Sequence, residues 1–80
     1  MKQGEIYLHY FNGACRVYLI TKTTNTAFYY IQPDGTCGMR SKDAYKRMQL
    51  VKEFPTWQQA LKSKFMKFNG VWNENRKTEF

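Results

Sequence analysis

The dipeptide Asn12-Gly13, which lies between two strand-like runs, constrains the fold of this chain more than any other feature. Apolar side chains stand at every second position from Ile6 to Tyr10, and a run rich in β-branched and aromatic residues extends from Cys15 to Thr21. Asn-Gly supplies the two positive-φ residues that a type I′ turn requires, and this turn matches the twist of paired strands. The pattern predicts an antiparallel hairpin near the start of the chain.

Two more strands are predicted after a polar connector at residues 23–26. The segment Ala27–Ile31 is rich in aromatic residues, and the turn sequence Pro33-Asp34-Gly35 closes it. Residues Thr36–Arg40 then form a short fourth strand. Gly38 within this strand indicates a bulge or a tight bend, because glycine has no side chain to pack.

The segment after the fourth strand predicts a helical turn and a fifth strand. Ser41 can cap the turn, which runs from Asp43 to Tyr45, and Met48–Val51 has the composition of a short strand. Five short strands with a helical turn before the last one are the order of elements in SH3-like barrels. We therefore predict a mainly β domain: a small five-stranded SH3-like (Tudor-like) barrel, or a curled antiparallel sheet, plus one C-terminal amphipathic helix.

The helix is predicted over residues 56–68. Thr56 and Gln59 fit the capping-box pattern, in which each side chain covers a free backbone N–H group of the first turn. Asn69-Gly70 ends the helix, because glycine adopts the left-handed C-terminal conformation at least cost. The apolar face of the helix, expected to pack against the sheet, holds Trp57, Ala60, Leu61, Phe65 and Phe68. Residues 1–72 then form a single domain, and residues 73–80 form a polar, frayed tail.

The stretch from Gly4 to Gly13 resembles the opening of a family of small bacterial SH3-like domains of unknown function, which begin with a Gly, Tyr, His-Tyr and Gly pattern at similar spacing. The resemblance covers these ten residues and the order of the strands, and it implies the barrel rather than a function. The small size and the richness in Asn, Tyr, Phe and Lys also resemble early proteins of bacteriophages, which commonly bind and redirect a host factor.

Positive charge dominates the chain, with 13 Lys and Arg residues against 6 Asp and Glu and a formal net charge of +7. Residues 40–77 hold ten of the basic residues and three of the acidic ones, so this stretch alone carries +7. A one-sided positive field attracts polyanions, and nucleic acid or an acidic protein surface is the expected partner. Small domains also carry net charge for solubility alone. The apolar runs are far shorter than the roughly 20 residues that cross a bilayer, and no signal-peptide pattern is present, so we expect a cytoplasmic protein without a membrane partner.

Catalytic chemistry is not expected. Cys15 and Cys37 have neither the spacing of a zinc site nor that of a redox pair, and we expect reduced structural thiols. His9 is the only histidine, and its pairing with Cys15 across the hairpin is the one nucleophile and base combination to consider. The carboxylates are scattered and no glycine-rich phosphate loop is present, so no metal site, no cofactor and no enzyme activity are predicted.

We predict a binding module, and the first hypothesis is that it binds DNA or RNA. In this hypothesis exposed aromatic rings stack on bases while cations meet phosphates. The candidate residues are Arg40, Lys42, Lys46, Arg47, Lys64, Lys67, Tyr29 and Tyr45. They come from separate segments, which only the tertiary fold can bring to one face. Each strand is expected to have one buried face, so about half of the strand aromatic residues point outward, with Tyr10, Phe28 and Tyr30 in the core.

The alternative hypothesis is a protein-binding adaptor or inhibitor that uses an aromatic groove or a sheet edge. A phage-encoded early protein that targets a host nucleic-acid-handling or defence protein would be of this kind. The two hypotheses differ in salt dependence, because phosphate contacts release counterions and weaken steeply as salt rises, whereas a protein complex survives moderate salt. The sequence leaves the oligomeric state open between monomer and dimer.

Overall fold

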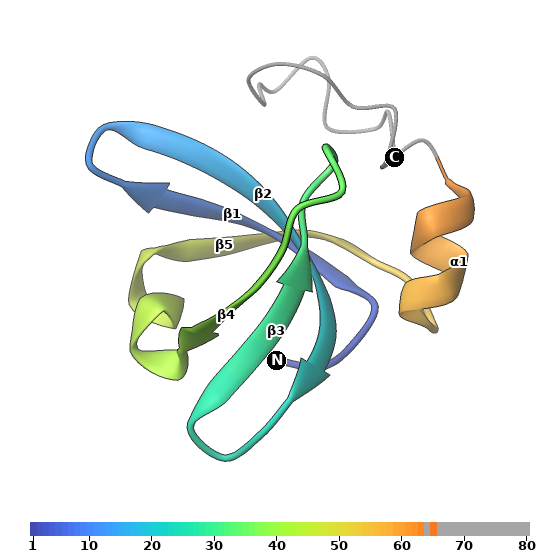
Figure 1. Ribbon diagram of the computed structural model, residues 1–80, viewed down its shortest axis with the longest axis horizontal. Coiled ribbons are helices and arrows are strands. Elements are labelled where there is room, and N and C mark those ends of the chain that lie inside the picture. The colour runs from blue at the N-terminus through green and yellow to red at the C-terminus, as the bar shows by residue number, and fades with distance from the viewer. Residues whose placement is uncertain (64, 66–80) are drawn as a thin grey trace.

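The structure is a computed structural model that describes residues 1–63 and 65, and a five-stranded antiparallel sheet dominates it (Figure 1). The strands are β1 (Glu5–Phe11), β2 (Ala14–Thr23), β3 (Ala27–Ile31), β4 (Cys37–Ser41) and β5 (Met48–Glu53). They pair in the order β4-β3-β2-β1-β5, so β4 and β5 are the two edges. A 3₁₀ turn, η1 (Lys42–Arg47), joins the two edges, and a short helix, α1 (Trp57–Lys62), follows β5. The predicted fold class, mainly β with one helix, is confirmed.

The hairpin of β1 and β2 has the predicted turn. Asn12 has a φ of 51° and Gly13 a φ of 74°, so both residues occupy the left-handed region that a type I′ turn uses. The two strands pair up to Phe11 opposite Ala14, which leaves a loop of these two residues. A loop this short fixes the register, and the register assigns every side chain of the hairpin to one face of the sheet.

Each face of β1 and β2 carries its own core. One core, here called the helix-side core, packs against α1 and consists of Ile6, Leu8, Val17, Leu19, Ala60 and Phe65. The other, here called the aromatic core, lies on the side of η1 and consists of Tyr7, Tyr18, Ile20, Phe28 and Tyr30. Figure 1 shows α1 and η1 on opposite sides of the molecule.

The prediction that each strand has a single buried face is wrong for β1. Five consecutive residues of this strand, from Glu5 to His9, are buried. The reason is that α1 covers one face, while Met1 and residues of η1 pack on the other. Phe28 and Tyr30 are buried as predicted, whereas Tyr10 is 46% exposed near the end of the hairpin.

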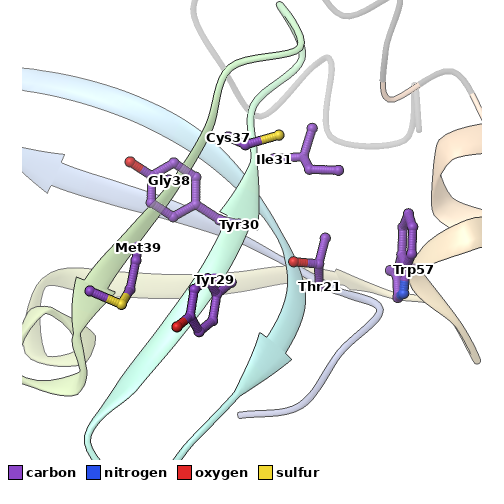
Figure 2. A pocket seen from close by; sticks show the side chains of 8 residues that line it. All are labelled: Thr21, Tyr29, Tyr30, Ile31, Cys37, Gly38, Met39 and Trp57. Atoms are coloured by element: carbon purple, nitrogen blue, oxygen red, sulfur yellow. The ribbon is translucent and has the colours of Figure 1, made fainter.

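Gly38 does not form the predicted bulge. The register between β3 and β4 runs without a shift, and Tyr30 lies opposite Gly38. A Cβ atom on Gly38 would lie 2.5 Å from the Tyr30 hydroxyl oxygen and 2.7 Å from the ring carbon Cζ. The glycine therefore makes room for the Tyr30 ring, which lies over β4 in Figure 2. The irregularities of the sheet occur instead where β1 pairs with β5 and where β2 pairs with β3.

The helix begins where the sequence predicts it. Thr56 is the N-cap, and its hydroxyl accepts a hydrogen bond from the Gln59 backbone N–H at 3.2 Å. A second cap comes from the N-terminal segment, where Gln3 Oε1 accepts from the Trp57 backbone N–H at 2.7 Å. Both bonds satisfy N–H groups of the first turn, which have no partner within a helix.

The helix ends earlier than predicted. Its last residue is Lys62, because Ser63 has an extended backbone and its hydroxyl donates a hydrogen bond to the Ala60 carbonyl. Trp57, Ala60 and Leu61 face the sheet as predicted. Phe68, the domain end at residue 72 and the tail at residues 73–80 lie outside the described residues.

The remaining boundaries differ from the predicted ones by one or two residues. β4 starts at Cys37 and includes Ser41, which also caps η1 by accepting from the Asp43 backbone N–H. β5 continues to Glu53, beyond the predicted end at Val51. Among the described residues, none of the helical segments is long and apolar enough to cross a membrane.

Candidate nucleic-acid interface

His9 lies at the centre of a buried polar network. The side chain is 1% exposed, and its Nδ1 atom lies 3.3 Å from the hydroxyl oxygen of Tyr18. The same oxygen accepts a hydrogen bond from Arg40 Nε at 2.9 Å. Because Arg40 donates to the Tyr18 oxygen, the Tyr18 hydroxyl hydrogen is free to be donated to Nδ1 of a neutral His9. The network joins β1, β2 and β4.

Three arginines gather around this histidine. Burial lowers the pKa of His9 from its ordinary 6.5, and the positive charges of Arg40, Arg16 and Arg47 lower it further. His9 is therefore neutral at pH 7. The three guanidinium groups come from β4, β2 and η1. Arg16, Arg40 and Arg47 are called the arginine cluster below.

The strand register explains why the arginine cluster forms. His9 lies opposite Arg16 on β2 and opposite Met48 on β5, and Met48 directly follows Arg47 at the end of η1. Arg40 approaches from β4 at the other edge of the sheet, and its Cζ atom lies 5.9 Å from the centroid of the Tyr18 ring. The curl of the sheet therefore brings side chains from both sheet edges toward one buried residue.

An exposed aromatic ring stands beside the arginine cluster. Phe11 is 42% exposed, and its ring is nearly parallel to that of His9, with an interplanar angle of 14° and 6.0 Å between the centroids. The two rings share a face because they are two positions apart on one strand. A flat apolar ring on the same sheet face as Arg16 suits a ligand that is both planar and negatively charged.

Acidic side chains lie at the other end of β1. Glu5 lies there, opposite Glu53 of β5. Within η1 the acidic residue, Asp43, is in the first turn, whereas Lys46 and Arg47 are in the last turn, next to the start of β5. Glu5 and Glu53 thus lie at the end of β1 away from the hairpin turn, where Lys52 also lies opposite Ile6, whereas Arg16 and Arg47 lie toward the turn.

Four of the predicted binding residues lie on η1. Lys46 and Arg47 are exposed, whereas Lys42 is half-buried. Tyr45 is exposed and packs edge-on against Tyr7, with 5.7 Å between the ring centroids. Lys42 and Tyr45 line a shallow depression of about 270 Å³. The four residues therefore share η1 but differ in direction: Arg47 belongs to the arginine cluster, whereas Tyr45 packs on Tyr7 and Lys42 lines the depression with Met1.

Tyr29 lies on the opposite face of the sheet, away from the arginine cluster. It alternates with the buried Phe28 and Tyr30, and it lies opposite Met39, which is 57% exposed. The Nζ atom of Lys22 lies 5.6 Å from the centroid of the Tyr29 ring. An open groove of about 500 Å³ lies here. Figure 2 shows the residues that line it, which are Thr21, Tyr29, Tyr30, Ile31, Cys37, Gly38, Met39 and Trp57.

Lys64 and Lys67 lie outside the described residues. The helix α1 packs on the helix-side core, whereas η1 lies on the side of the aromatic core. A lysine of α1 such as Lys62 therefore lies across the sheet from the arginine cluster. The described part of the helix does not extend that cluster.

Sequence reasoning missed Phe11 and Arg16 as parts of this surface, and it missed His9 as the buried residue behind them. The signal was present in the hairpin: once the Asn12-Gly13 turn is fixed, the register places Arg16 opposite His9. Phe11 then follows two positions later on the same face of β1. Arg40 was predicted as a phosphate ligand, but it is half-buried and its Nε atom is bonded to a tyrosine.

The one Cys-His pair considered from the sequence does not form. Cys15 lies opposite Tyr10, whereas His9 lies opposite Arg16, so the thiol and the imidazole point to opposite faces of the hairpin. Burial raises the pKa of the Cys15 thiol, and a hydrogen bond with Tyr10 partly offsets this. In the part of the chain that the structure describes, no group of three or more His, Cys, Asp and Glu residues is placed to hold a metal ion.

The chemistry available at this surface is therefore anion binding by guanidinium groups next to an aromatic ring. Comparisons of the chain with protein-family models, with curated proteins and with solved structures found no match.

Proposed function

We propose that this protein is a small nucleic-acid-binding module and that the arginine cluster with Phe11 is its binding surface. The observation that carries the proposal is the placement of three arginines about the buried His9. Arg16 lies opposite His9, and Arg40 is bonded to the Tyr18 hydroxyl that His9 contacts. Arg47 precedes Met48, which also lies opposite His9, and the exposed ring of Phe11 stacks on the histidine. Like charges held together on one surface repel one another, and a polyanionic partner relieves that repulsion. Nucleic acid offers phosphates to the guanidinium groups and a base to the ring.

The three arginines have different roles in this proposal. Arg16 and Arg47 are exposed, and they are the phosphate ligands. A guanidinium group presents its N–H donors in a planar fork that fits two phosphate oxygens at once. Arg40 is held by Tyr18 through Nε, so it adds positive potential and fixes the tyrosine. Lys46, exposed in the last turn of η1, extends the surface.

The test is a fluorescence-anisotropy titration of labelled single-stranded and duplex DNA and RNA over a range of salt concentrations. Arg16→Gln and Arg47→Gln should each weaken binding. Each should also reduce the slope of log K against log salt by about 0.7 to 0.9 for every phosphate that the variant no longer neutralises. The matched controls, Lys22→Gln and Lys62→Gln, remove the same charge beside Tyr29 and on α1.

The proposed surface is supported if the two arginine variants lose more affinity than the two lysine variants do. An equal loss of affinity in all four variants would point to net charge alone and would remove the arginine cluster from the proposal. Absence of binding at low salt for every nucleic acid would overturn the nucleic-acid function itself.

A second candidate function is the binding of an acidic, extended peptide of a partner protein. The observation that favours it is the groove beside β4, where Tyr29 and Met39 expose apolar surface. β4 is an edge strand, so its outer backbone groups face no other strand of the described sheet and can pair with an added strand. Lys22 at the groove favours a peptide with acidic side chains.

This second function is tested with a labelled peptide in which glutamate alternates with valine, compared with one in which lysine replaces glutamate. Met39→Asp, which puts a negative charge into the groove, should abolish binding of the acidic peptide, whereas Arg16→Gln should leave it unchanged. Equal binding of both peptides, or of neither, would contradict the second function.

A further inference from the structure

We infer that the Phe11 ring is a platform on which one unpaired base stacks, so that the ligand is single-stranded nucleic acid rather than duplex. This inference rests on the proposed function, because the arginine cluster must hold the phosphate backbone next to the ring. No sequence pattern singled out Phe11, and the inference assigns to its ring a stacking contact with a base that the arginines do not make.

Phe11 projects beyond the end of the sheet on one side. β5 begins at Met48, which lies opposite His9, so in the described sheet β5 provides no partner for Phe11. On the other side Phe11 lies opposite Ala14, whose methyl group is too small to cover an aromatic ring. The ring is therefore 42% exposed although it shares a face with the fully buried His9.

The ring continues a row of neighbouring aromatic side chains that starts inside the domain, in which the two outer contacts are stacked and the middle one, between Tyr18 and His9, is tilted by 36°. Tyr30 and Tyr18 stack with 3.9 Å between centroids, Tyr18 and His9 are 5.3 Å apart, and His9 and Phe11 are 6.0 Å apart. Phe11 is the outermost member of this row, with His9 behind it. A base stacked on the free face of Phe11 extends the row by one ring, in the offset arrangement that aromatic pairs prefer.

The platform is fixed before a ligand arrives. Phe11 is the last residue of β1 and is followed directly by the two-residue turn, so its backbone has no loop freedom. The His9 ring behind it is held by Tyr18, which Arg40 holds in turn. Binding then orders the ligand and little of the protein, which reduces the entropy cost of association.

The arrangement discriminates between single strands and duplexes. In a duplex each base is paired and stacked between its neighbours, so the ring of Phe11 meets backbone only, and the arginines alone contribute. An unpaired base presents a free face to the ring while its flanking phosphates lie within reach of the guanidinium groups. The stacking contact is therefore made only with a single strand.

The test compares three labelled probes: oligothymidylate of about ten nucleotides, a duplex of the same length, and a strand of the same length in which every nucleotide lacks its base. Phe11→Ala should weaken binding of oligothymidylate by about fivefold to about 150-fold. It should leave the affinities for the duplex and for the abasic strand unchanged, because those ligands offer no free base. Phe11→Trp should retain binding of oligothymidylate, and Tyr29→Ala, which removes an exposed ring on the other face, is the matched control.

The outcomes that would overturn this inference differ from those that would overturn the proposed function. If Phe11→Ala weakens all three probes equally, or none of them, while Arg16→Gln still weakens binding, the stacking platform is overturned and the nucleic-acid surface stands. If no probe binds, both are overturned. Should Phe11→Ala lose the thermal unfolding transition, Phe11→Leu replaces it, because leucine keeps the apolar bulk and lacks the flat face, and the same outcomes then apply.

Discussion

Tyr18 is the residue on which the buried polar network depends. Its ring is fully buried against Tyr30, and its single oxygen contacts both His9 and Arg40. Among the described residues, no buried side-chain nitrogen or oxygen lacks a hydrogen-bond partner. A buried network that is completely satisfied favours one arrangement of its side chains, so Tyr18 fixes the positions of His9 and Arg40.

We expect Tyr18→Phe to lower the free energy of unfolding by about 1 to 3 kcal/mol. The ring stays, but His9 Nδ1 and Arg40 Nε lose their common partner inside the protein. Urea denaturation measures the difference. The control is Tyr29→Phe, whose hydroxyl lies on an exposed side chain and whose effect should stay within about 0.5 kcal/mol. Equal stability of the two variants would contradict the network.

We expect stability to fall as the pH drops below 6.5. The pKa of His9 in the folded protein is lower than the ordinary 6.5, so the unfolded chain takes up the proton first. The folded state then loses up to about 1.4 kcal/mol for each pH unit between 6.5 and the folded pKa, whereas above 6.5 both states hold a neutral histidine. Carboxylates titrate mainly below this window.

His9→Gln removes this titration and keeps a side chain that can bond to Tyr18. Urea denaturation of both proteins at about pH 7.5 and about pH 5.5 should therefore show a pH-dependent loss of stability in the parent chain and a smaller loss in the variant. An equal loss in both proteins would assign the pH dependence to other groups.

At the scale of elements, structure that depends on neighbouring residues could be predicted and structure that depends on distant ones could not. The Asn12-Gly13 turn and the Ser41 and Thr56 caps each follow from a few adjacent residues. The role of Gly38 depends on a ring from another strand. Arg40 likewise finds its partner 22 positions away, which no local pattern reveals, and this is why the candidate site was predicted only in part.

We expect Gly38→Ala to destabilise the fold by about 1 to 3 kcal/mol, through overpacking rather than backbone strain. The added methyl would collide with the Tyr30 ring, which cannot withdraw because it stacks on Tyr18 at 3.9 Å. Thermal or urea denaturation measures the destabilisation. Cys37→Ala, at the exposed neighbouring position, should change stability by less than about 0.5 kcal/mol.

The cause of the destabilisation by Gly38→Ala can be isolated by making the same substitution in a chain that lacks the Tyr30 ring. In a Tyr30→Leu chain the collision is relieved, so the cost of Gly38→Ala should shrink in a double-mutant cycle. A cost that is the same in both backgrounds would mean that the Tyr30 ring is not what Gly38 accommodates.

At the scale of the whole molecule, β1 and β2 form a central hairpin between two cores. Ile6 and Leu8 face the helix-side core, whereas Tyr7 and His9 on the same strand face the side of the aromatic core. Loss of either core exposes one face of the hairpin, and the hairpin then no longer supports the other core. The two cores are therefore coupled through strands that they share, although they do not form one cluster.

This coupling predicts that the domain unfolds in a single transition. In a Trp72→Phe background the fluorescence of Trp57 reports on α1 and the helix-side core, and the near-ultraviolet circular dichroism of the tyrosines reports on the aromatic core. The two signals should give coincident urea curves. Leu8→Ala, expected to cost about 2 to 5 kcal/mol, should move both curves together, as should Phe28→Ala on the other face. If Leu8→Ala moved only the tryptophan curve, the two cores would be independent units, and a ligand on the arginine cluster would then stabilise the aromatic core alone.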